Sequence, residues 1–88
     1  MDDRILQRVA SRGILQSLTK EELELDRRPV TTDPRPARVQ AWVRFGTEPV
    51  LVDADLCMWT DRAAAIRFRV GDQERRCWVW SGAVLRDG

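Results

Sequence analysis

The chain has 88 residues, of which 43% are hydrophobic and 33% are charged, and its formal net charge at pH 7 is +1. This length leaves room for one domain, and the composition is typical of a globular protein and excludes a disordered chain. No apolar run approaches the roughly 20 residues that cross a bilayer. The N-terminus lacks the basic start and apolar core of a signal peptide, so we expect a cytoplasmic protein without membrane contact.

Residues 1–37 are predicted to form a helical segment followed by a proline-containing connector. Asp2 and Asp3 are suitable helix caps, and Gly13 is a suitable terminator. Between them, apolar residues recur at the helical spacing of three to four, namely Ile5, Leu6, Val9 and Ala10. This pattern predicts a first amphipathic helix.

A second short helix is predicted after the apolar residues Ile14, Leu15 and Leu18. Thr19 and Glu22 have the spacing of a capping box, which predicts a helix from about Lys20 to Asp26. The connector spans residues 27–37, where three prolines favour an extended chain.

Residues 38–88 are predicted to form a small β-barrel, because the hydrophobic period changes from helical to two. The expected strands cover residues 38–45, 50–58, 64–70, 74–80 and 84–86, with turns at 46–49, 60–62 and 71–73. Five short strands with tight turns predict a five-stranded SH3-like barrel. An OB-like barrel or an open, strongly curved sheet would give a similar pattern.

The alternation places all four tryptophans of the chain on the outside of this sheet. Val39, Ala41 and the equivalent positions of the other strands point inward, so the opposite positions form an outer Trp/Arg face. The residues expected on this face are Trp42, Arg44, Trp59, Arg67, Arg76, Trp78 and Trp80. Contiguous apolar patches on monomers are normally small or functional, so something should cover these indoles.

Two structural explanations compete with a functional one. The N-terminal helical segment can cover the indoles with its apolar residues, namely Ile5, Leu6, Val9, Ile14 and Leu18. Alternatively, a bulge reverses the fourth strand and places Trp78 and Trp80 in the core.

The functional hypothesis is a protein-interaction or assembly module that uses the Trp/Arg face, with a protein partner or self-association. Trp and Arg are enriched at interface hot spots. The alternative is a nucleic-acid-binding small β-barrel, in which the indoles stack on bases. The near-neutral charge weighs against it, because nucleic-acid binders usually carry a positive excess.

No catalytic constellation is expected. The chain has no histidine to act as a general base. Cys57 and Cys77 are too few for a four-ligand zinc site, and they point to opposite faces, so we expect no disulfide between them. Asp53 and Asp55 share a strand face but lack a third metal ligand. We therefore expect no enzyme activity, no cofactor and no metal.

Overall fold

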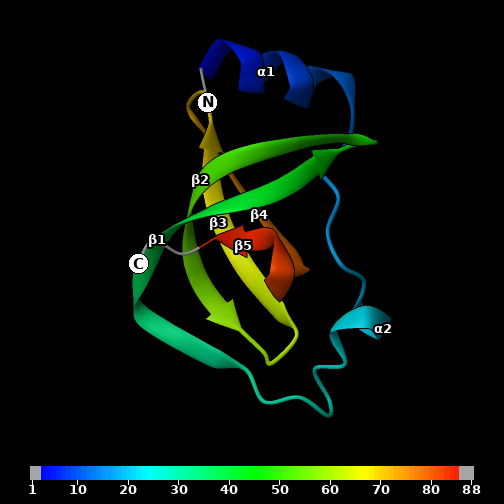
Figure 1. Cartoon of the computed structure of the whole chain (residues 1–88), viewed down its shortest axis with the longest axis vertical. Helices are drawn as coiled ribbons and strands as arrows, with labels where there is room; N and C mark the ends of the chain where they lie inside the picture. Colours follow the sequence, from blue (N-terminus) through cyan, green and yellow to red (C-terminus); the bar gives the residue numbers. More distant parts are fainter. Residues whose placement is uncertain (1–2, 86–88) are drawn as a thin grey trace.

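The computed structural model describes residues 3–85, and its main element is a single antiparallel sheet (Figure 1). The sheet order is β4-β3-β2-β1-β5. Its strands are β1 (Thr31–Phe45), β2 (Glu48–Trp59), β3 (Ala63–Val70), β4 (Gln73–Trp80) and β5 (Val84–Leu85). The other elements are the helices α1 (Asp3–Arg12) and α2 (Lys20–Leu23) and the 3-10 helix η1 (Ser81–Ala83). The mainly β prediction is confirmed, but no ladder joins the edge strands β4 and β5, so the sheet is not closed.

The predicted facing of β1 and β4 is confirmed. In β1 the alternate residues from Val39 to Phe45 are buried and the residues between them are exposed. In β4, Cys77 and Val79 are buried whereas Trp80 is exposed, so this strand is not reversed. The inward side chains of the sheet form one continuous hydrophobic core.

Trp59 corrects the prediction for β2. The register between β2 and β3 passes from Leu56↔Ile66 to Met58↔Ala65, so an extra residue is inserted at Cys57. A bulge of this kind turns the following side chains relative to the sheet. Trp59 consequently packs against the hydrophobic core instead of pointing outward.

Helix α1 lies across one end of the sheet (Figure 1). Its buried stripe consists of Leu6 and Val9, which belong to the same core as the sheet residues. The prediction that this stripe covers the indoles is therefore wrong. Ile5 and Ile14, which were also expected to cover the indoles, are instead exposed over 51% and 80% of their surfaces.

The short helix α2 begins with the predicted capping box. Thr19 Oγ1 accepts from the Glu22 amide, and Glu22 Oε1 accepts from the Thr19 amide. The helix ends at Leu23, before the predicted Asp26, because Glu24 adopts a left-handed conformation with φ 50°. A hydrogen bond from Arg28 lowers the pKa of the Glu24 carboxyl, and Arg28 also pairs with Asp61 at 2.7 Å.

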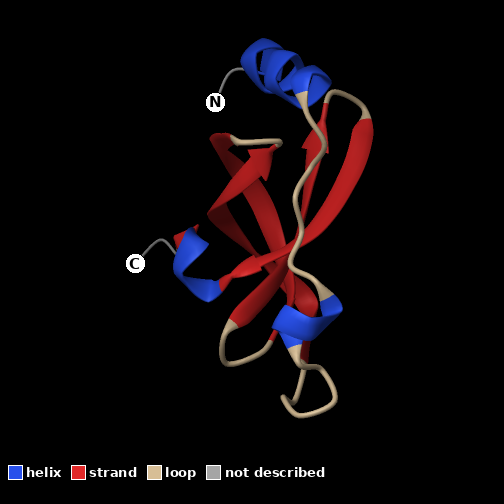
Figure 2. Ribbon diagram, turned by 90° about the vertical axis from the view of Figure 1, so that its right-hand side faces the viewer, coloured by secondary structure: helices blue, strands red, loops and turns tan. Residues whose placement is uncertain are grey.

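Residues 13–18, here called the strap, connect α1 to the cap of α2 and run along the sheet (Figure 2). The Gln16 amide donates to the Arg44 carbonyl of β1 at 2.8 Å, and the Leu18 amide donates to the Trp78 carbonyl of β4 at 3.0 Å. The strap thus links β1 to β4, which do not pair with each other. A Cβ on Gly13 would lie 2.7 Å from the amide nitrogen of Gly46, so only glycine allows this approach.

Strand β1 begins at Thr31 instead of at the predicted Arg38, so the second half of the connector joins the sheet. Thr31 pairs with Trp59 and Thr32 with Met58, and the register is then interrupted until Ala37. The interruption contains Pro34 and Pro36, which cannot donate to a ladder.

Candidate functional site

Four residues of the predicted Trp/Arg face line one groove, here called the Trp groove. Trp42 and Arg44 come from β1, and Trp78 and Trp80 come from β4. The groove has a volume of about 580 Å³. Its lining also includes strap residues Gln16–Leu18 together with Glu22, Pro49 and Ala83.

The groove follows from the way in which the sheet fails to close. Strands β1 and β4 face each other here without a common ladder, and Val43 and Val79, whose side chains are buried in the core, contribute to its lining. The outward positions on both strands carry indoles. Two strand edges therefore bring large aromatic side chains to the same opening, although they are far apart in the sequence.

Two of the indoles remain open to solvent. Trp42 is 46% exposed and Trp80 is 45% exposed, whereas Trp78 is half-buried. The Trp78 backbone is held by the strap, because its amide donates to Ser17 Oγ at 2.9 Å and its carbonyl accepts from the Leu18 amide. Trp78 is thus a fixed wall, and Trp42 and Trp80 offer free apolar surface.

The Trp groove carries little net charge. Arg44 Nη1 donates to the Thr47 carbonyl at 3.4 Å, and no carboxylate of residues 3–85 forms a salt bridge with it. Glu22 is the acidic residue of the lining, and its carboxylate is part of the α2 capping box. One cation and one anion on a mostly apolar lining that includes three indoles favour an apolar ligand over a strongly charged one.

Arg67 and Arg76 lie outside the Trp groove and are neutralised by acidic neighbours. Asp55 binds Arg67 at 3.1 Å, and Glu74 approaches Arg67 at 3.8 Å and Arg76 at 3.0 Å. The hydrogen bond that Arg67 donates to Asp55 raises the pKa of the Arg67 guanidinium. Both arginines share a neighbouring depression with Trp78, which therefore borders the groove on one side and the ion pairs on the other.

The remaining candidates do not assemble into a reactive site. Asp55 is engaged with Arg38 and Arg67, and Asp53 accepts only a long bond of 3.4 Å from Gln40. Cys57 and Cys77 are free thiols, and burial raises the pKa of Cys77 to about 11. Within residues 3–85, acidic and cysteine side chains form no cluster with the three ligands that a metal ion needs.

Leu18, Glu22 and Pro49 line the Trp groove but were not predicted as part of the functional face. Leu18 was expected only as one of several residues covering the indoles. No sequence signal places Glu22 of α2 or Pro49 of β2 beside the indoles, because the approach of these elements to β4 is a feature of the tertiary structure. Leu18 is held at the groove by a hydrogen bond from its amide to the carbonyl of Trp78, which is distant in the chain.

Among the described residues, no helix has both the length and the apolarity needed to cross a bilayer. Searches against protein-family models, curated proteins and solved structures find no match to this chain. The side chains of the Trp groove are therefore the basis for proposing what it binds.

Proposed function

We propose that this chain is a non-catalytic protein-interaction module whose Trp groove binds an apolar segment of a partner protein. The observation that supports it is the pair of half-exposed indoles, Trp42 and Trp80, on two facing strand edges. Aromatic residues in well-packed, desolvated positions dominate the energy of most protein interfaces. Full burial of one such side chain is worth roughly 2–3 kcal/mol.

The charge distribution favours a protein partner over nucleic acid. Binding to a phosphate backbone requires free cations along the contact surface. Arg67 and Arg76, which the sequence suggested as such cations, are both in ion pairs with acidic residues. Arg44 is the cationic side chain of the groove lining, and Glu22 offsets it.

We also propose that the sheet is an SH3-like barrel. The five antiparallel strands and the strap, which links β1 to β4, support this barrel. The cytoplasmic location expected from the sequence is also part of the proposal.

The test uses the full chain and variants Trp42→Ala and Trp80→Ala. Leu25→Ala is the matched control, because Leu25 is also 45% exposed but does not line the groove. Proteins captured by the wild-type chain are purified, and their affinity for each variant is measured by titration. Loss of a hot-spot indole should weaken binding by roughly 30-fold, equivalent to about 2 kcal/mol. Leu25→Ala should leave the affinity unchanged.

Two parallel measurements distinguish the other occupants. Sedimentation at increasing concentration detects self-association, which should be lost in Trp42→Ala if a second copy occupies the groove. Single-stranded and duplex oligonucleotides are titrated at low and physiological salt, where phosphate contacts would give a steep salt dependence. Tight, salt-sensitive oligonucleotide binding that depends on Arg44 would refute the protein-interaction proposal. Equal partner affinities of Trp42→Ala, Trp80→Ala and wild type would also refute it.

A further inference from the structure

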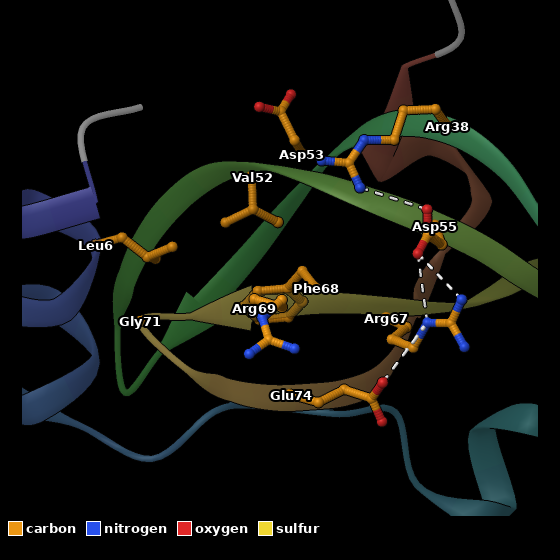
Figure 3. A pocket seen from close by; sticks show the side chains of 10 residues that line it. All are labelled: Leu6, Arg38, Val52, Asp53, Asp55, Arg67, Phe68, Arg69, Gly71 and Glu74. Carbon is orange, nitrogen blue, oxygen red and sulfur yellow. Dashed lines mark hydrogen bonds and ion pairs between the residues drawn. The ribbon is translucent and has the colours of Figure 1, made fainter.

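A second opening lies where β2 and β3 separate, away from the Trp groove. The ladder between these strands begins at Asp55↔Arg67 and does not continue to Ala54 and Phe68 or to Asp53 and Arg69, the pairs that would follow in the same register. Beyond this point β2 continues to pair with β1, and β3 with β4. Figure 3 shows Val52 and Asp53 on one side of the resulting cleft, and Phe68 and Arg69 on the other. Leu6 of α1 also lines this cleft, whose volume is about 540 Å³.

The main-chain groups of Asp53 and Arg69 point into the cleft. Hydrogen-bonded pairs alternate along an antiparallel ladder, and the two-residue turns require bonded pairs at Phe45↔Glu48 and Val70↔Gln73. Val52 therefore bonds to β1 and Phe68 to β4, which leaves the amide and carbonyl of each following residue facing the cleft. The strap supports this alternation independently, because it donates to the carbonyls of Arg44 and Trp78. In this alternation the main-chain groups of both residues point away from the neighbouring strand of their ladder.

The charged side chains at the cleft rim differ in whether they have an ionic partner. Arg38, Asp55, Arg67 and Glu74 form a continuous series of ion pairs across the four strands. Asp53 and Arg69 take part in no salt bridge among the described residues, and Arg69 donates only to the Asp72 carbonyl. The two edges of the cleft thus carry opposite charges without ionic partners.

We propose that this cleft binds an extended peptide segment, which adds as a strand between the splayed ends of β2 and β3. Alternating donors and acceptors on two strand edges match a peptide main chain, which is the basis of strand addition. The unpaired charges require a basic peptide side chain facing Asp53 and an acidic one facing Arg69. The apolar side chains of Val52 and Phe68 favour small apolar residues at the inward positions.

Amide hydrogen exchange followed by NMR tests this site in the full chain. The amides of Asp53 and Arg69 should exchange fast in the free protein, whereas the neighbouring Val52 and Phe68 amides should be protected. The probe is the peptide acetyl-Thr-Lys-Val-Glu-Val-Thr-amide. At a concentration about tenfold above its Kd, it should slow exchange at Asp53 and Arg69 by about tenfold. The same peptide with both valine nitrogens methylated should have no effect, because it lacks the required donors.

A charge exchange tests the side-chain part of the proposal. The double variant Asp53→Lys and Arg69→Glu should prefer the peptide in which Lys and Glu are exchanged, and a thermal melt checks that it is folded. Trp42→Ala should leave the peptide response unchanged, which separates this site from the Trp groove. Protected Asp53 and Arg69 amides in the free protein would show that β2 and β3 pair directly. That result would overturn the proposal. Equal binding of the methylated peptide would also overturn it, and so would the absence of protection at about 1 mM probe, a concentration that detects even weak binding.

Discussion

The docking of α1 is tested most directly by Leu6→Ala. Leu6 is 6% exposed and belongs to the sheet core. The substitution removes three carbon atoms from this environment, which costs about 2.4 kcal/mol at roughly 0.8 kcal/mol each. Since Leu6 also lines the β2–β3 cleft, water can enter the space that is left. We therefore expect a total loss of about 2–3 kcal/mol, in the lower part of the range for buried leucines.

Ile5→Ala is the matched control, because it removes the same number of carbon atoms from an adjacent residue that is 51% exposed. It should cost less than about 1 kcal/mol, and the better helix propensity of alanine offsets part of that. Thermal and urea unfolding followed by circular dichroism measure both changes. Since 1 kcal/mol shifts the Tm of a domain of this size by about 4–8 °C, Leu6→Ala should lower Tm by roughly 10 °C or more. Equal effects of the two substitutions would refute the docking of α1 through Leu6.

Two further predictions concern the strap and the thiols. Gly13→Ala should destabilise the protein by about 1–3 kcal/mol and expose the Gln16 and Leu18 amides to exchange, because its Cβ would collide with the Phe45–Gly46 backbone. Gly82→Ala is its control, since no atom lies within 4 Å of a Cβ there, and equal unfolding curves would contradict the strap contact. At mildly alkaline pH a thiol reagent should modify Cys57 before Cys77, because Cys77 is buried and its pKa of about 11 keeps it protonated. Intact-mass analysis measures the order, and equal rates would contradict the packing of β4.

Local features of the sequence predicted much of the secondary structure. The capping box at Thr19 and Glu22 requires only residues three apart, and the alternation in β1 reports directly which side chains share a face. Gly71 predicted a hairpin turn because glycine readily adopts a positive φ, and its φ in the structure is 62°. Each of these signals is contained within a few neighbouring residues, so a single sequence is sufficient to read them.

The bulge at Cys57 shows where local reasoning fails. Nothing in the alternation of β2 indicates an extra residue, because the bulge arises from pairing with β3. It turns Trp59 toward the core and separates it from the other indoles. The start of β1 at Thr31 was not predicted for a related reason. Thr31 joins the sheet by pairing with Trp59, which is distant in the chain.

The sequence by itself predicted that four strands carry inward apolar residues and that Trp42 lies on an opposite position, whereas it left two orientations open for Trp78 and Trp80. It could not determine which of these positions meet, because that depends on which strand edges face each other after the chain has closed its long loops. The tertiary structure decided that β1 and β4 approach without pairing and that the strap links them. It also decided that Arg67 and Arg76 are paired with acidic residues while Arg44 is not. Hydrogen bonds and ion pairs between segments distant in the chain determine these contacts, and such interactions exist only in the folded chain.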